Sequence, residues 1–170
     1  MSHSYNSRVA VAACPRLDNL LACLSMNLTE EAQQALLAAL AYASDKAEPN
    51  SITIVIEPLN RFDNPGYFLH TTGQAVELIH ALGRDNVKLM FDCYHVQISE
   101  GDLTRRIGTL LPLIHHIQIA AVPSRREPDE GEIAYDRLLP AIDAMGYRGF
   151  IGAEYRPTAA VEEGLSWMRR

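Results

Sequence analysis

The stretch 51–61, SITIVIEPLNR, joins an apolar run to an acid. Residues 52–56 are mostly β-branched, which is typical of a strand buried inside a sheet. The run ends on Glu57. The stretch 149–157, GFIGAEYRP, repeats this order and ends its small apolar run on Glu154. Two strands suited to burial that each end on a carboxylate indicate a functional site at the strand ends.

Composition and length narrow the class of protein. The 170 residues are 48% hydrophobic, which predicts a single domain over 1–170 with a sizeable core. The net charge of −6 argues against nucleic acid or an anionic membrane as a partner, because both attract basic surfaces. Three cysteines without a CxxC pair predict reduced thiols and a cytoplasmic location. No apolar run approaches the roughly 18 residues of a membrane span, and no signal peptide is recognisable.

Strands and helices alternate along the chain. The segment 71–83 has helical spacing and begins with a capping box formed by Thr71 and Gln74. The helix expected at 102–113 begins on Asp102, a residue that favours the N-cap position. The expected strands are 8–14, 52–56, 86–95, 115–122 and 149–155, and the expected helices are 28–47 (with Thr29 as N-cap), 71–83, 102–113, 135–146 and 159–170.

This alternation predicts a parallel sheet, because each helix must carry the chain back across the sheet. An open doubly wound sheet and part of a (β/α) barrel both satisfy the pattern. The sequence has no GxGxxG motif, so nothing points to a dinucleotide fold or a nucleotide cofactor.

Polar side chains lie at or near the carboxyl ends of four successive strands: Glu57, Asp92, Gln118 and Glu154. In a (β/α) barrel these ends meet at one mouth. Carboxylate and amide oxygens suit Mg²⁺ or Mn²⁺, and such an ion relieves the repulsion between crowded acids. A bound divalent cation also polarises a carbonyl and stabilises an enediolate. The pattern therefore favours aldose–ketose isomerisation, or another proton transfer next to a carbonyl, without a redox cofactor.

Four motifs resemble the hydroxypyruvate isomerase family in sequence and order: IEPLNRFDNPGYFLHT, FDCYHVQISEGDL, HHIQIAAVPSRREPDEGEI and GFIGAEYRP. This family and the related 2-oxo-tetronate isomerases are xylose isomerase-like TIM barrels. The resemblance covers roughly residues 30–167. It implies an α/β fold of the (β/α) TIM-barrel type. It also implies a small 2-oxo acid substrate, hydroxypyruvate, which is interconverted with 2-hydroxy-3-oxopropanoate (tartronate semialdehyde).

The resemblance also implies roles for individual residues. Glu57 and Glu154 match the paired proton donor and acceptor, while Asp92 and Gln118 match the positions that complete the metal site. His95 resembles a residue that contacts a substrate oxygen. Arg125 falls where a cation could hold the substrate carboxylate, with Arg126 as a competing choice.

Other candidate residues are expected to be structural. His115 and His116 are placed before their strand, at the end opposite to the site, and Cys93 is assigned to the core by strand alternation.

The chain of 170 residues is shorter than this family requires. A complete (β/α)₈ barrel takes about 250 residues, and the motif order places Glu57 on the fifth strand and Glu154 on the eighth. The segment 8–14 would then belong to the fourth strand, within an atypical N-terminal segment at 1–27. Three explanations stay open: part of a longer reading frame, a natural short form whose barrel is completed by association into a homo-oligomer, or an open sheet that tolerates the loss.

The functional alternatives also stay open. The first is another isomerase or epimerase of the same superfamily, acting on a 2-oxo-tetronate, a sugar acid or a sugar. The second is a truncated, catalytically silent domain.

Overall fold

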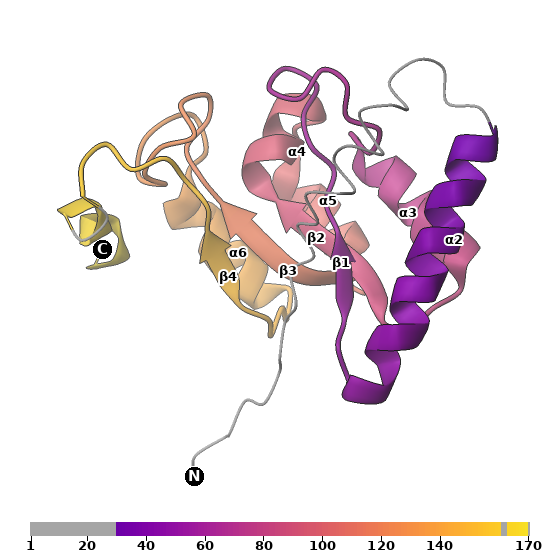
Figure 1. Ribbon diagram of the computed structural model, residues 1–170. Helices are drawn as coiled ribbons and strands as arrows, with labels where there is room; N and C mark the ends of the chain where they lie inside the picture. The colour runs from indigo at the N-terminus through magenta and orange to yellow at the C-terminus, as the bar shows by residue number, and fades with distance from the viewer. Residues whose placement is uncertain (1–29, 161–162, 170) are drawn as a thin grey trace, which may run out of the picture.

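The computed structural model of the chain describes residues 30–160 and 163–169 (Figure 1). The expected strand at 8–14, the N-cap Thr29 and the atypical segment 1–27 lie outside the described residues.

Four strands form one parallel sheet in the order of the sequence: β1 (Ile54–Ile56), β2 (Val87–Asp92), β3 (Ile114–Ile119) and β4 (Ile151–Ala153). Every neighbouring pair is parallel, and the register places Asp92 opposite Gln118 and Gln118 opposite Gly152. This arrangement confirms the predicted α/β fold, in which helices return the chain between parallel strands.

The helices connect and cover these strands. They are α2 (Glu30–Ala47), α3 (Thr72–Leu82), α4 (Cys93–Ser99), α5 (Leu103–Leu110) and α6 (Tyr135–Ala144), with 3₁₀ turns η1 (Glu48–Asn50) and η2 (Glu163–Arg169). In Figure 1, α2 and α3 lie on the β1 side of the sheet and α6 lies on the β3–β4 side. No helix within the described ranges is long and apolar enough to span a membrane. The cytoplasmic location stays a prediction.

The predicted capping box of α3 is confirmed. The Thr71 side chain accepts from the backbone N–H of Gln74, and the Gln74 side chain accepts in return from the Thr71 N–H. Gly83 ends the helix in the left-handed conformation, with φ of 60°, which glycine adopts without steric cost.

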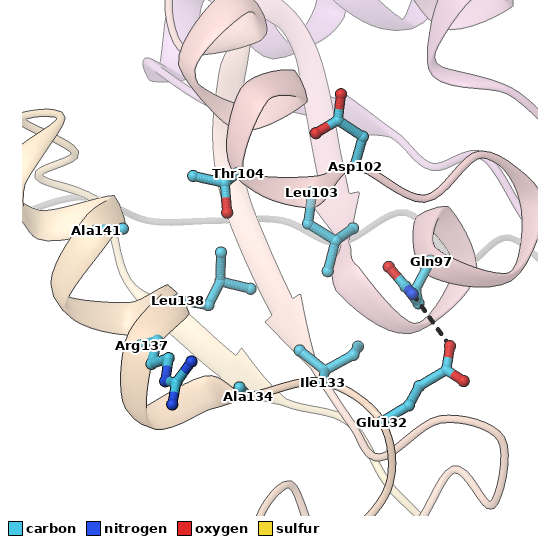
Figure 2. Close-up of a pocket in the computed structure, with 10 residues that line it drawn as sticks. All are labelled: Gln97, Asp102, Leu103, Thr104, Glu132, Ile133, Ala134, Arg137, Leu138 and Ala141. Carbon is cyan, nitrogen blue, oxygen red and sulfur yellow. Dashed lines mark hydrogen bonds between the residues drawn. The ribbon is translucent and has the colours of Figure 1, made fainter.

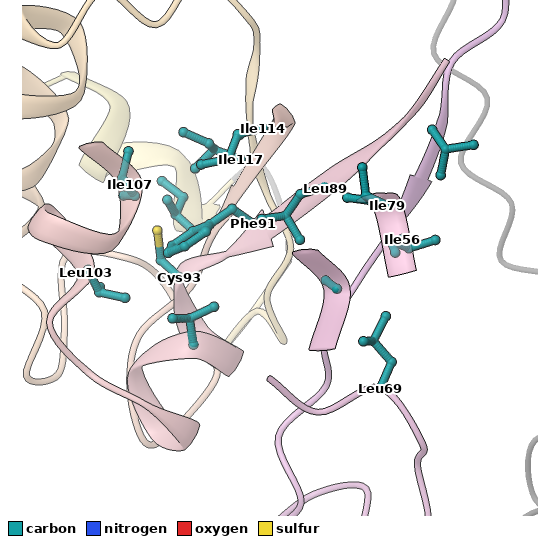
Figure 3. Packing of buried hydrophobic residues seen from close by; sticks show 14 of the residues in the cluster. Ile56, Leu69, Ile79, Leu89, Phe91, Cys93, Leu103, Ile107, Ile114 and Ile117 are labelled. Carbon is teal, nitrogen blue, oxygen red and sulfur yellow. The ribbon is translucent and has the colours of Figure 1, made fainter. Parts of the chain in front are cut away.

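The hydrophobic core lies between the sheet and helices α3, α5 and α6 (Figure 3). Leu89, Phe91 and Ile117 are fully buried on this side of the sheet. Burial of each such side chain contributes roughly 1.5–3 kcal/mol. Because side chains alternate along a strand, Asp92 and Gln118 point to the opposite side. Cys93 is fully buried in the same core, as predicted.

Some predicted boundaries were wrong. The strand expected over 86–95 ends at Asp92, and α4 begins at the next residue. The Asp92 carboxylate accepts a 2.8 Å hydrogen bond from the Tyr94 N–H, which caps α4. This tertiary arrangement overrides the strand preference of the aromatic and β-branched residues that follow.

The remaining differences concern element ends. Asp102 is the N-cap residue of α5, as expected, but it has φ of 52° and its side chain makes no capping hydrogen bond. His115 and His116 lie within β3, not before it, and that strand ends at Ile119. Within the segment expected to be a helix at 159–170, the described residues Glu163–Arg169 form the 3₁₀ turn η2 instead.

Candidate active site

The carboxyl ends of the four strands bring together the side chains predicted from the sequence. Glu57 follows β1, Asp92 ends β2 and Gln118 lies directly beside it on β3. Glu154 follows β4, and its backbone N–H donates a 3.2 Å hydrogen bond to the Ile119 carbonyl. The four side chains therefore share one edge of the sheet, as expected for parallel strands.

His95 connects two of the acids. Its Nε2 atom lies 3.8 Å from Glu57 Oε1 and 3.8 Å from Asp92 Oδ2. His95 reaches this place from the first turn of α4, three residues after Asp92, so the short helix positions the ring above the strand ends.

Arg125 lies between the third acid, Glu154, and Asp92. Its Nη2 atom lies 3.2 Å from Glu154 Oε2 and 3.8 Å from Asp92 Oδ2. The guanidinium also lies 5.0 Å from the centre of the Tyr94 ring, in a cation–π contact. Arg126 is exposed, so of the two candidates it is Arg125 that faces the acids.

Several buried polar atoms at this edge have no hydrogen-bond partner. Among the described residues six such side-chain atoms occur, and four belong to this site: Glu57 Oε1, Asp92 Oδ2, His95 Nε2 and Gln118 Oε1. Buried polar atoms are normally paired, so this concentration indicates a place prepared for a ligand.

The donor set fits a metal ion. Glu57, Asp92 and His95 each offer a ligand atom, and these atoms lie within 4.8 Å of one another. The unpartnered amide oxygen of Gln118 adds a hard oxygen donor beside them.

The crowding of acids changes their ionisation. Burial, followed by the charges of Asp92 and Glu154, raises the pKa of Glu57 to about 8. Burial also raises the pKa of Asp92 to about 6, although the Tyr94 N–H and the Arg125 charge oppose the rise.

His95 stays neutral near pH 7. Burial, followed by the positive charge of Arg125, lowers the pKa of His95 to about 4. A neutral imidazole has one donor nitrogen and one acceptor nitrogen, so the partners of the ring decide which nitrogen faces the acids.

Sequence reasoning missed several residues that support the site. Asn60, Asp63 and Tyr94 are hydrogen-bonded to His95 or to one another. Asn60 and Asp63 lie within the motif 56–71 that carries Glu57, but their contacts depend on the chain folding back over 35 and 31 residues. No local pattern could have revealed these partners.

Glu127 joins the two loops that carry Arg125 and Glu154. Its carboxylate accepts 2.8 Å hydrogen bonds from both the backbone N–H and the hydroxyl of Thr158. The Arg156 N–H donates a 2.7 Å hydrogen bond to the Arg125 carbonyl. Arg125 itself has φ of 52°, unusual for a side chain with a Cβ atom, so the loop fixes where its guanidinium points.

A pocket of about 500 Å³ lies elsewhere, around α4, α5 and α6 (Figure 2). Leu103, Ile133 and Leu138 line it, and Gln97 donates a 3.0 Å hydrogen bond to Glu132 at one side. None of the six predicted site residues lines this pocket.

Comparison with known proteins identifies the family. The protein-family model described as xylose isomerase-like TIM barrel matches residues 15–170 of the chain. The chain belongs to this family. Within the family it is 45% identical over 130 residues to a 2-oxo-tetronate isomerase of Cupriavidus necator, a match that covers 76% of the chain and 50% of that protein. It is 41% identical over 140 residues to a hydroxypyruvate isomerase of Escherichia coli, covering 82% of the chain and 54% of that protein.

A solved structure agrees with the family assignment. The crystal structure described as AP endonuclease, family 2, from Brucella melitensis superposes with a TM-score of 0.82 at 41% identity, covering 86% of the chain and 57% of that structure. The chain spans about half the length of the curated relatives it matches.

Proposed function

We propose that the chain is an isomerase that interconverts hydroxypyruvate and 2-hydroxy-3-oxopropanoate by proton transfer through an enediolate. The observation that carries the proposal is the group of unpartnered atoms of Glu57, Asp92, Gln118 and His95 at one edge of the sheet. The isomerase names of relatives at 36–45% identity support the reaction class.

Glu57 and Glu154 are the proposed proton-transfer residues. One glutamate removes a proton from the hydroxymethyl carbon, and the released electron pair forms the carbon–carbon double bond of the enediolate, with negative charge on the former carbonyl oxygen. The other glutamate delivers a proton to the former carbonyl carbon. The hydroxyl hydrogen moves from one oxygen to the other, so the product has the same composition as the substrate.

The other residues bind and orient the substrate in this proposal. Glu57, Asp92, Gln118 and Glu154 would hold Mg²⁺ or Mn²⁺, which when bound polarises the carbonyl and stabilises the negative charge of the enediolate. His95 contacts a substrate oxygen. The positive charge of Arg125 suits the carboxylate of a 2-oxo acid.

The direct test is a turnover assay of the chain with hydroxypyruvate, with and without added Mg²⁺ or Mn²⁺. Glu154→Gln keeps the size of the side chain and removes the base, so we expect turnover to fall by about 10²–10⁴-fold. Glu77→Gln, which changes an exposed glutamate on α3, is the matched control and should leave turnover unchanged. Full turnover in Glu154→Gln would refute the role of this residue, and undiminished turnover after exhaustive chelation would remove the cation from the mechanism.

A second candidate is isomerisation of a 2-oxo-tetronate. Relatives named 2-oxo-tetronate isomerase reach 45% and 44% identity, compared with 41% for a named hydroxypyruvate isomerase. A panel that compares kcat/KM for 2-oxo-tetronates, hydroxypyruvate and related sugars and sugar acids separates these substrates. Absence of turnover on the whole panel would favour the catalytically silent domain.

Association of copies is a further part of the proposal. Within the described residues the outer edges of β1 and β4 have no strand partner. Phe150, directly before β4, is 61% exposed, and Ile151, its first residue, is 37% exposed. Unpaired edges and exposed apolar side chains favour pairing with another chain. We expect light scattering after size exclusion to give a mass above 18.9 kDa, and a monomer at all concentrations would contradict association.

A further inference from the structure

The Nδ1 atom of His95 faces two N–H donors, both of which belong to Asn60. The backbone N–H of Asn60 donates to His95 Nδ1 at 3.1 Å, and the side-chain Nδ2 of Asn60 lies 2.7 Å from the same atom. Both residues are almost completely buried, so water does not compete for these contacts. An N–H group cannot accept a hydrogen bond, so Nδ1 must be the acceptor and carries no proton.

The orientation of the Asn60 amide is fixed by Asp63. Asn60 Oδ1 accepts a 2.8 Å hydrogen bond from the Asp63 N–H, and Asn60 Nδ2 donates to Asp63 Oδ2 at 2.9 Å. The reversed amide would place an oxygen against the Asp63 carboxylate and an NH₂ group against the Asp63 N–H. Tyr94 holds the same carboxylate through a 2.6 Å hydrogen bond from its hydroxyl. The donor that faces His95 is therefore assigned by the network around it.

We propose that Asn60 is a positioning residue that keeps His95 in the tautomer with the proton on Nε2. His95 then presents an N–H donor to the volume beside Glu57 and Asp92, where Nε2 has no hydrogen-bond partner among the described residues. This inference rests on the proposed function only for the identity of the acceptor, which would be a substrate oxygen.

The same tautomer excludes His95 from the metal ligands, although its Nε2 lies close enough to the acids to be counted with them. Ligation through Nε2 needs a free lone pair on that atom, and a neutral ring would then carry its proton on Nδ1. That proton would point at the two N–H groups of Asn60, and all three donors would be left without acceptors. The cation would therefore be held by oxygen atoms, with His95 beside it as a donor.

Nitrogen-15 NMR of the histidine side chains tests the tautomer without any assay of activity. The His95 signals are assigned by their loss in His95→Gln, and the pattern of long-range couplings shows which nitrogen carries the proton. We expect the Nε2–H tautomer in the wild-type protein. Asn60→Asp places an acceptor oxygen beside Nδ1, so the population of the Nδ1–H tautomer should rise. Asn64→Ala changes an asparagine in the same loop that donates no hydrogen bond to His95, and it should leave the wild-type pattern.

Two results would overturn the proposal. One is an Nδ1–H tautomer in the wild-type protein, which decides the matter even if Asn60→Asp does not fold. The other is an unchanged tautomer in folded Asn60→Asp, which would remove the role of the Asn60 side chain. A loss of stability alone would not move the tautomer, so it cannot imitate the predicted result.

Cation binding gives an independent measurement. Calorimetric titration with Mn²⁺ should show that His95→Gln raises the Kd by no more than about 100-fold, the upper limit of the loss typical of groups that only support a metal site. A loss of more than about 100-fold would make His95 a ligand and overturn the exclusion. If turnover is absent but the tautomer is Nε2–H, the proposed function fails and this inference stands.

Discussion

At the scale of single residues, Glu57 is the group whose surroundings change its ionisation most clearly. Its pKa of about 8 in the folded chain lies above the value of 4.5 expected for an exposed glutamate. Between these values the folded state binds more protons than the unfolded state, so the free energy of unfolding falls as pH rises from about 4.5 to about 8. The neighbouring acid Asp92 is shifted in the same direction.

Glu57→Gln should therefore stabilise the metal-free protein at pH 8 and have a smaller effect at pH 5, because glutamine cannot ionise. Thermal unfolding at the two pH values measures the difference. Addition of a divalent cation should reduce the gain at pH 8, since the cation favours the charged carboxylate of the wild-type protein. An equal change in Tm at both pH values would contradict the raised pKa of Glu57.

The residues that end strands were predictable, whereas those held by tertiary contacts were not. Glu57 and Glu154 follow apolar runs that identify strand ends directly in the sequence. The choice between Arg125 and Arg126 depended on a loop in which Arg125 adopts a positive φ. Asn60 carries no local signal of its contact with His95, because the two residues are separated by 35 positions.

At the scale of elements, the N-terminus of α3 illustrates how local sequence determines a boundary. The capping box of Thr71 and Gln74 satisfies N–H groups that have no partner inside the helix. Thr71→Ala should lower the free energy of unfolding by about 1 kcal/mol, measured by denaturant titration. Thr104→Ala, at an exposed position of α5, is the control and should change it by less than about 0.5 kcal/mol. An equal effect of the two substitutions would contradict the capping role.

The short helix α4 shows where element prediction fails. Seven residues after Asp92 contain aromatic and β-branched side chains, which favour a strand when they are considered alone. The capping hydrogen bond to the Tyr94 N–H and the burial of Cys93 and Val96 on one face produce a helix instead. This difference matters for function, because α4 places His95 against Glu57 and Asp92.

At the scale of the whole molecule, the parallel strand order explains why side chains almost a hundred residues apart share one site. The core between the sheet and its helices fixes the strands, and alternation along each strand turns Asp92 and Gln118 to the other side. The sequence alone indicated this arrangement because each strand is followed by a helical pattern.

A divalent cation should stabilise the folded chain by mass action. A free cation concentration of 100 times Kd corresponds to about 2.7 kcal/mol, which raises Tm. Asp92→Asn removes a fully buried carboxylate from the oxygen set and should abolish most of this increase, while Asp129→Asn, at an exposed position in the loop after β3, should retain it. A cation-dependent increase that is the same in Asp92→Asn and the wild-type protein would place the binding site elsewhere.

Hydrogen exchange in the substrate tests whether Glu57 and Glu154 act on the same small molecule. Hydroxypyruvate is incubated with the chain and divalent cation in deuterium oxide, and proton NMR follows the loss of hydrogen from the hydroxymethyl carbon. We expect exchange well above the rate in buffer for the wild-type protein and for Glu77→Gln, and exchange near the buffer rate for the double variant Glu57→Gln/Glu154→Gln. Wild-type exchange no faster than in buffer, or equally fast exchange in the double variant, would contradict proton transfer by these two glutamates.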